Sequence, residues 1–124
     1  MKILVITAHP DDVDFGAGGT VATWVSEGHE VVYCLVTDGQ AGGSDNTITR
    51  EEMARIRRRE QTAAANILGV TELHWLGFPD GAVVPDLNLR REISAVIRMV
   101  KPDRVLTQSS ERRYDRIYAS HPDH

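Results

Sequence analysis

Two short motifs near opposite ends of the chain place carboxylates beside imidazoles. They are "AHPDD" at residues 8–12 and "HPDH" at residues 121–124. Carboxylates crowded in this way repel one another, and a bound cation is the simplest way to cancel that repulsion. A ligand set of carboxylate oxygens and imidazole nitrogens without a thiolate suits zinc, and it can also hold iron or manganese. The two motifs together therefore predict a metal site.

Spacing within the motifs indicates which side chains could share one ion. His9 and Asp12 are three residues apart in an expected tight turn, so both could face the ion while Asp11 points elsewhere; His121 and His124 repeat this spacing. Three protein ligands would leave an open position, where the metal lowers the pKa of bound water to about 7. The remaining carboxylate is then a candidate general base, and the remaining histidine a candidate oxyanion donor. Spacing alone leaves open which aspartate binds and which removes the proton.

Each motif also has a structural interpretation when taken alone. In "AHPDD", Pro10 could fix a turn between a strand and a helix, and the aspartates could cap that helix. "HPDH" is similarly ambiguous. Because both motifs are expected at strand ends of the same sheet, the metal site is the favoured interpretation.

A nucleotide-binding loop is an alternative of another class. Gly16, Gly18 and Gly19 suggest a glycine-rich loop, and Asp38 at the end of the second strand stands about where a ribose-binding acid belongs. The G-x-G-x-x-G pattern, however, would require glycine where Val21 stands, and the cluster begins too far from the first strand. The glycines are instead expected to let the start of a helix pack closely against the sheet.

Strands and helices alternate along the chain. Short apolar runs rich in β-branched residues are typical of strands covered on both faces, and segments of helical periodicity separate them. The alternation predicts an α/β fold with a Rossmann-like, doubly wound, mostly parallel sheet. In such a sheet the carboxyl ends of the strands meet at one edge, so both motifs should lie there. The expected strands span residues 2–7, 30–37, 72–76 and 104–108, and the expected helices lie within 18–29, at 51–68 and at 87–100.

The helix at 51–68 carries charge on the face that is expected to be buried. Arg57 and Glu60 fall within the apolar arc at 100° per residue. Arg57 could pair with Glu60 or an aspartate, or it could reach the strand ends and bind a ligand; periodicity favours the pair. Asp80 in "FPDG" is first of all a turn residue. The apolar arc consists of Met53, Ile56, Ala63, Ala64, Ile67 and Leu68.

Composition bounds the class of protein. The chain has 124 residues, enough for one domain, and a net charge of −4 that gives no electrostatic reason to bind nucleic acid or an anionic membrane. Its single cysteine, Cys34, cannot form an internal disulfide, so we expect a buried thiol in a reducing compartment. No apolar run has the length of a signal-peptide core or a membrane span, and we therefore expect a cytoplasmic protein.

The motifs closely resemble those of the PIG-L/LmbE-like zinc-dependent de-N-acetylases. The resemblance rests on "AHPDD" followed by "DFGAGGT", then "TDG", Arg57-x-x-Glu60 before "LGV", "PDG" and finally "HPDH", and it spans essentially the whole chain. Members of this family hydrolyse the N-acetyl group of N-acetylglucosamine conjugates, and some relatives cleave other amides, including those of thiol-sugar conjugates. The resemblance thus implies a hydrolase that uses zinc, or another divalent transition metal such as Fe²⁺, on a small N-acetylated sugar conjugate.

Family roles can be carried over position by position. The resemblance implies that His9, Asp12 and His124 bind the metal and that Asp11 is the general base. It further implies that His121 stabilises the oxyanion or protonates the leaving amine.

For the remaining positions the resemblance implies supporting roles. Asp123 would orient His121, and Arg57 and Asp80 would contact the sugar. Family chains usually continue well past "HPDH", whereas this one ends at His124. We therefore expect residues 1–124 to be a single domain that is truncated at its C-terminal end, or a site completed by another chain, as in a homo-oligomer. An inactive interaction module remains a further alternative.

Overall fold

Four strands and three helices alternate in the computed structural model, which describes residues 1–41, 47–111, 115 and 121–124. The third helix occupies the predicted range, and the second begins one residue before it. The third strand continues two residues beyond the prediction and the fourth ends one residue before it. In chain order the elements are β1 (Lys2–Thr7), α1 (Asp12–Ser26), β2 (Glu30–Thr37), α2 (Arg50–Leu68), β3 (Glu72–Phe78), α3 (Leu87–Val100) and β4 (Arg104–Thr107).

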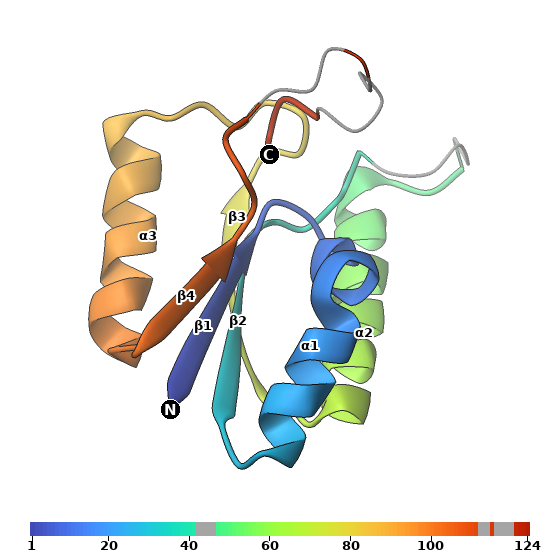
Figure 1. Ribbon diagram of the computed structural model, residues 1–124. Helices are drawn as coiled ribbons and strands as arrows, with labels where there is room; N and C mark the ends of the chain where they lie inside the picture. Colours follow the sequence, from blue (N-terminus) through green and yellow to red (C-terminus); the bar gives the residue numbers. More distant parts are fainter. Residues whose placement is uncertain (42–46, 112–114, 116–120) are drawn as a thin grey trace.

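The strands form one parallel sheet in the order β3-β2-β1-β4. Figure 1 shows α1 and α2 side by side on one face of the sheet and α3 on the other. The chain therefore crosses from β3 back past β1 to β4 by way of α3, and the predicted α/β fold with helices on both faces is confirmed. The strand order is the one that begins a Rossmann sheet.

Residues that alternate along β1 and β2 fill two separate core layers. Ile3, Val5 and Tyr33 pack with the layer under α1 and α2, whereas Leu4 and Cys34 pack with the layer under α3. Both central strands are thus covered on both faces, which explains why their sequences are almost continuously apolar. Within the described part of the chain, none of the helices is long and apolar enough to cross a membrane.

The first helix begins earlier than its sequence suggests. It starts at Asp12, so Gly16, Gly18 and Gly19 lie inside α1 rather than before it. Among the described residues, a Cβ atom at any of the three glycines would meet nothing within 4 Å. The prediction that these glycines allow close packing against the sheet is therefore wrong. The apolar side chains that anchor this helix, Val13 among them, outweigh the low helix propensity of glycine.

The buried face of α2 is also rotated relative to the prediction. Ile67 is 85% exposed and Glu60 is also exposed, while Gln61 and Ala65 are completely buried. The apolar arc located Arg57 correctly on the partly buried side but missed the buried glutamine. Periodicity of apolar residues cannot detect a buried polar side chain, because such a residue is stabilised by hydrogen bonds that the pattern does not contain.

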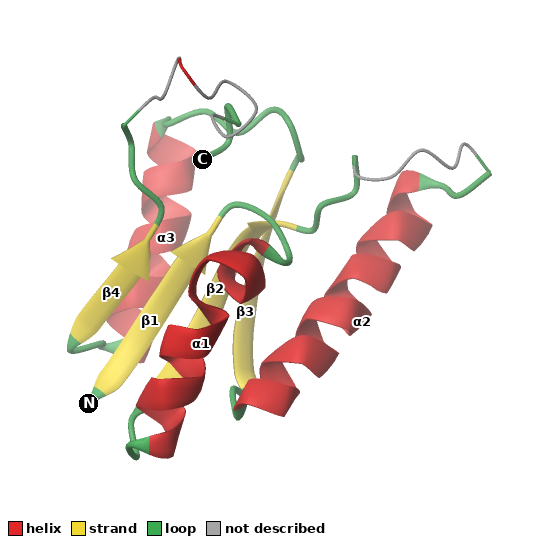
Figure 2. Cartoon of the chain, turned by 45° about the vertical axis from the view of Figure 1, so that its right-hand side comes forward, coloured by secondary structure: helices red, strands yellow, loops and turns green. Residues whose placement is uncertain are grey.

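The loops that carry the two motifs meet at one edge of the sheet. The segment after β1 leads directly into α1, and Figure 2 shows it at the same end of the sheet as the C-terminus. The end of β2 is tied to the first of these loops, since Thr37 donates to the Ala8 carbonyl through both its main-chain N–H, at 2.8 Å, and its hydroxyl, at 2.9 Å. The sheet thus sets the distance between residues that are far apart in sequence.

Two glycines, each just after a helix, provide a matched test of how α1 packs against the end of α2. Gly28 and Gly69 both have a left-handed backbone, with φ of 90° and 91°, but a Cβ atom at Gly69 would lie 2.6 Å from Val25 Cγ1 whereas one at Gly28 meets nothing within 4 Å. We expect Gly28→Ala to lower the free energy of unfolding by about 1–2 kcal/mol, the cost of the left-handed backbone alone. Gly69→Ala should cost clearly more because it adds the clash. Denaturant unfolding measures both, and equal losses would contradict the packing of α1 against the end of α2.

Candidate metal centre and active site

A cleft of about 510 Å³ opens at the carboxyl edge of the sheet. This volume lies within the range of sites for small molecules. Residues from both motifs and from the loops after β2 and β3 line it. They are His9, Pro10, Asp11, Asp12, Phe15, Gly39, Ala41, Arg57, Asp80, Gly81, His121 and His124. All the predicted site residues except Asp123 thus line one cleft.

Asp11 stands in the N-cap position of α1 but does not cap it. Its backbone is left-handed, with φ of 76°, and its side chain makes no capping hydrogen bond. Its side chain is 39% exposed and lies 3.4 Å from the Arg57 guanidinium. The capping alternative therefore does not account for this carboxylate, which lines the cleft.

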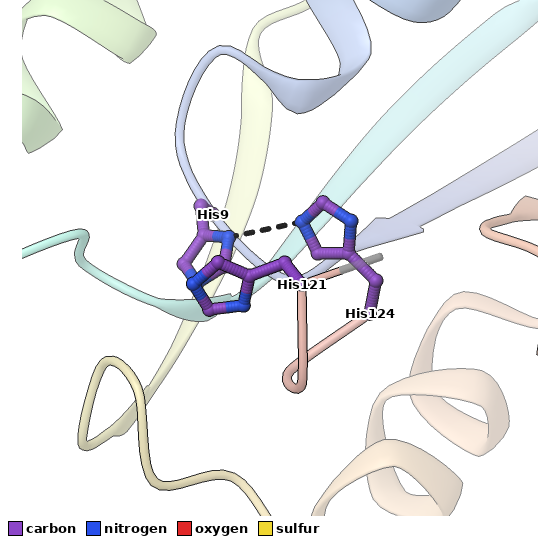
Figure 3. A group of neighbouring side chains, drawn as sticks. All are labelled: His9, His121 and His124. Atoms are coloured by element: carbon purple, nitrogen blue, oxygen red, sulfur yellow. Dashed lines mark hydrogen bonds between the residues drawn. The ribbon is translucent and has the colours of Figure 1, made fainter. Parts of the chain in front are cut away.

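Three donor atoms from the two motifs form a compact triangle. His9 Nδ1 lies 3.2 Å from His124 Nε2 and 3.5 Å from Asp12 Oδ2, and the Asp12 and His124 atoms are 3.3 Å apart. Figure 3 shows the imidazoles of His9 and His124 facing each other, with His121 alongside. In a tetrahedral zinc site with ligands at about 2.0–2.1 Å, neighbouring ligand atoms are about 3.3 Å apart. The donor set and its spacing therefore fit a zinc ion.

The other nitrogen of His9 faces two further carboxylates. His9 Nε2 lies 2.8 Å from Asp123 Oδ2 and 2.9 Å from Asp80 Oδ1. Asp123, whose side chain is fully buried, also accepts the main-chain N–H groups of Gly81 at 2.7 Å and Val83 at 3.1 Å. Its contact to His121 Nδ1 is longer, at 3.8 Å.

A second set of atoms around His9 could therefore also hold an ion. The side chains of His9, Asp80, His121 and Asp123 each bring a donor atom within 4.8 Å of the others, as do those of His9, His121 and His124. A histidine that binds a metal usually donates its second N–H to a carboxylate. We therefore interpret the Nδ1 side of His9 as the metal side and the Nε2 side as the side that orients the ring. In this arrangement Asp123 supports His9 more closely than it supports His121.

The pKa values show how the cluster is balanced without a metal. Burial tends to lower the pKa of His9, but its hydrogen bonds to the Asp12 and Asp123 carboxylates raise that pKa to about 9. Burial tends to raise the pKa of Asp12, and the hydrogen bonds with His9 nevertheless hold it below its ordinary value. Burial, assisted by the charges of His9 and His121, lowers the pKa of His124. A proton on His9 thus neutralises carboxylates that a metal would otherwise neutralise.

Arg57 reaches the same loop from α2. Its Nη2 donates to the Pro10 carbonyl at 3.1 Å and lies beside the Asp11 carboxylate, whereas Glu60 is exposed. Gly39 makes this approach feasible, because a Cβ atom there would lie 3.1 Å from both Arg57 Nε and Pro10 Cδ. The structural pair expected for Arg57 is therefore with Asp11, and its side chain also lines the cleft.

Two glutamines that the sequence analysis did not single out contact the "AHPDD" loop. Gln61 lies on the buried side of α2, and Gln108 directly follows β4. Each forms hydrogen bonds with both a main-chain N–H and a carboxylate of the segment from Ala8 to Asp14. A polar residue just after a strand was a weak signal for Gln108, whereas the sequence contained no comparable signal for Gln61.

Comparison with known proteins places this geometry in a family. The family model described as "PIG-L: GlcNAc-PI de-N-acetylase" matches residues 4–124. The diacetylchitobiose deacetylase of Thermococcus kodakarensis is 39% identical over 123 residues, which are 99% of this chain and 45% of that protein. A mycothiol S-conjugate amidase of Streptomyces coelicolor is 30% identical over 100% of this chain and 48% of its own length.

A solved structure extends the likeness to three dimensions. It is that of N,N'-diacetylchitobiose deacetylase from Pyrococcus horikoshii complexed with its inhibitor MPG, with a TM-score of 0.93 and 36% identity. The match covers 99% of this chain and 45% of that one. The chain thus spans about half the length of the relatives it matches.

The raised pKa of His9 predicts how the metal-free protein responds to pH. Since the folded state holds this proton with a pKa of about 9 instead of 6.5, it contributes stability that is fully present below pH 6.5 and is lost as the pH rises through 9. Over this window the free energy of unfolding should fall by on the order of 3 kcal/mol. Thermal or denaturant unfolding of chelator-treated protein at a series of pH values measures this. His9→Gln should flatten the dependence, and a flat profile in the unsubstituted protein would contradict the assignment.

Proposed function

The chain belongs to the PIG-L family of GlcNAc-PI de-N-acetylases, and on this premise we propose that it is a metal-dependent hydrolase of an N-acetylglucosamine-type conjugate. The observation that carries the proposal is the triangle of His9 Nδ1, Asp12 Oδ2 and His124 Nε2, with edges of 3.2–3.5 Å, at the cleft. The reaction adds water across the acetamide, so that the C–N bond breaks and acetate and a free amine are released.

We propose His9, Asp12 and His124 as the residues that hold the ion, with zinc as the metal and Fe²⁺ as an alternative. A divalent transition metal at this position supplies a Lewis acid that acidifies water and polarises a carbonyl oxygen. Asp123 and Asp80 would fix the imidazole of His9 through its second nitrogen. Such carboxylate support raises the basicity of a histidine ligand and holds its ring in place.

Asp11 is the proposed general base. Its carboxylate lines the cleft, is partly open to solvent and is not occupied in capping the helix. It is therefore free to take a proton from the attacking water. Asp12, whose Oδ2 is already surrounded by imidazole nitrogens and amide hydrogens, is less suited to that role.

His121 is the proposed partner on the other side of the substrate. Its side chain is 40% exposed, and its ring centroid lies 4.5 Å from that of His9. From there it could donate a hydrogen bond to the developing oxyanion or a proton to the leaving amine. That Asp123 orients His121 stays a prediction; the hydrogen bond between them that the structure contains runs from the Asp123 main-chain N–H to His121 Nδ1, at 3.1 Å.

Arg57 and Asp80 are the proposed contacts to the sugar. Both line the cleft, Arg57 with a guanidinium that can bind hydroxyl or carbonyl oxygens. Asp80 is only 9% exposed, and it also accepts the Ala41 N–H at 2.9 Å. Its remaining capacity to accept a hydrogen bond would be directed at a hydroxyl group that enters the cleft.

Each alternative function considered from the sequence can be distinguished from the proposed deacetylase. A thiol-sugar amidase would use the same residues on another amide, and a panel of N-acetylated sugars and thiol-sugar amides distinguishes the two. The nucleotide-binding alternative requires a glycine-rich loop before the first helix, whereas Gly16, Gly18 and Gly19 lie inside α1. An inactive interaction module would fold but bind neither metal nor substrate.

For the cell we propose the cytoplasm. The support is Cys34, a free and buried cysteine whose thiol pKa is raised by burial to about 12. A proposed homo-oligomer and the absence of a nucleic-acid partner stay predictions, which sedimentation and binding measurements test.

Two aspartate variants separate the proposed roles. Asp11→Asn should keep stoichiometric zinc and lose about 10²- to 10⁴-fold in kcat, because it removes the base but no ligand. Asp12→Ala should instead lose zinc, and activity with it. Metal analysis after gel filtration, together with amine release from N,N'-diacetylchitobiose and N-acetylglucosamine, measures both. Equal loss of zinc in the two variants would refute the assignment.

Arg57→Ala tests whether this residue contacts the substrate. We expect a KM at least tenfold higher, because the variant loses a contact to the sugar, and only a small fall in melting temperature from the lost hydrogen bond to the Pro10 carbonyl and ion pair with Asp11. Arg57→Lys serves as the control that keeps the charge without the planar guanidinium. A large loss of thermal stability with an unchanged KM would return Arg57 to a purely structural role.

A further inference from the structure

Gln61 joins α2 to the loop that carries the proposed base. Its side chain is 0% exposed, its Oε1 accepts the Asp11 main-chain N–H at 2.7 Å, and its Nε2 donates to Asp14 Oδ2 at 3.2 Å. A buried primary amide is costly unless its groups are paired, and here both the oxygen and the nitrogen find partners. The glutamine is therefore held in one orientation by the loop at Asp11 and by Asp14 in the first turn of α1.

Gln108 repeats this pattern from the opposite side of the loop. Its Oε1 accepts the Ala8 main-chain N–H at 3.0 Å, and its Nε2 donates to Asp12 Oδ2 at 3.2 Å. Gln108 directly follows β4, whereas Gln61 belongs to α2, so the two contacts come from independent elements. Each amide accepts from the main chain with its oxygen and donates to a carboxylate with its nitrogen.

The loop requires such support because its backbone is unfavourable at the critical residue. Asp11 has φ of 76° without being glycine, a conformation that costs about 1 kcal/mol or more unless the surroundings fix it. Its side chain makes no capping bond that could do so. The hydrogen bond from its N–H to Gln61 fixes the peptide plane that precedes its Cα, and thereby the direction in which its carboxylate leaves the backbone.

We propose that Gln61 and Gln108 are positioning residues, two amide clamps that hold the base Asp11 and the metal-binding Asp12 in their separate directions. The inference rests on the proposed function for the roles of the two aspartates. The two glutamines contact different aspartates of the loop. In the hydrogen bonds given for the described residues, Gln61 is joined to Asp11 and Asp14 and to no proposed metal ligand, whereas Gln108 is joined to Ala8 and Asp12 and not to the base.

Because the two glutamines contact different aspartates, substitution by methionine should affect kcat at one position and zinc affinity at the other. Gln61→Met keeps the size of the side chain but removes both hydrogen bonds, so kcat should fall at least tenfold while KM and zinc affinity stay within threefold. Gln108→Met should weaken zinc binding at least tenfold and leave kcat near its original value once zinc is saturating.

The experiment combines zinc titration by calorimetry, steady-state kinetics and hydrogen exchange of the Asp11 and Ala8 amides. Val70→Ala is the matched control, because Val70 is fully buried next to the end of α2 and a cavity there should lower the melting temperature without altering kcat or zinc affinity. In Gln61→Met the Asp11 amide should exchange faster while the Ala8 amide does not, and Gln108→Met should show the reverse.

Failure of this inference can be told apart from failure of the proposed function. If the unsubstituted protein releases no amine from acetylated sugars, the proposed function fails, and zinc affinity together with amide exchange still tests the clamps. The inference is overturned if Gln61→Met lowers only the melting temperature, as Val70→Ala does. It is also overturned if both glutamine variants lose zinc and kcat to the same extent, or if the exchange rates of the two amides do not change.

Discussion

Repulsion between carboxylates at the carboxyl edge of the sheet is the constraint on which the site depends. Asp12, Asp80 and Asp123 surround a single imidazole, that of His9, at 2.8–3.5 Å. Without a metal, a proton on that imidazole neutralises part of their charge, which is why the pKa of His9 rises to about 9. A divalent cation on the Nδ1 side would neutralise more, and the position of His124 completes a ligand set for it.

The parallel sheet brings these groups together from distant parts of the chain. Because β1 is central and pairs with both β2 and β4, the loop after it lies between the ends of its two neighbours. α2 contributes Arg57 and Gln61 from one side, and the segment after β4 contributes Gln108 from the other. The left-handed backbone of Asp11 then separates two adjacent aspartates, Asp11 toward Arg57 and Asp12 toward His124.

The sequence predicted the parts of this arrangement that follow from local patterns. Apolar runs located the strands, alternation gave the α/β sheet, and the strand-end positions of the two motifs predicted that the motifs would meet at one edge of the sheet. Other parts depend on tertiary contacts that no local pattern contains. The start of α1 at Asp12 and the buried face of α2 were misplaced, because packing overrides glycine propensity in one case and hydrogen bonds bury Gln61 in the other.

Anomalous diffraction from crystals grown with zinc tests the central claim most directly, because it locates the ion relative to the two sides of His9. The account predicts one strong peak about 2.0–2.1 Å from His9 Nδ1, Asp12 Oδ2 and His124 Nε2. A peak instead between His9 Nε2, Asp80 and Asp123, or no peak in a map that resolves these side chains, would contradict it.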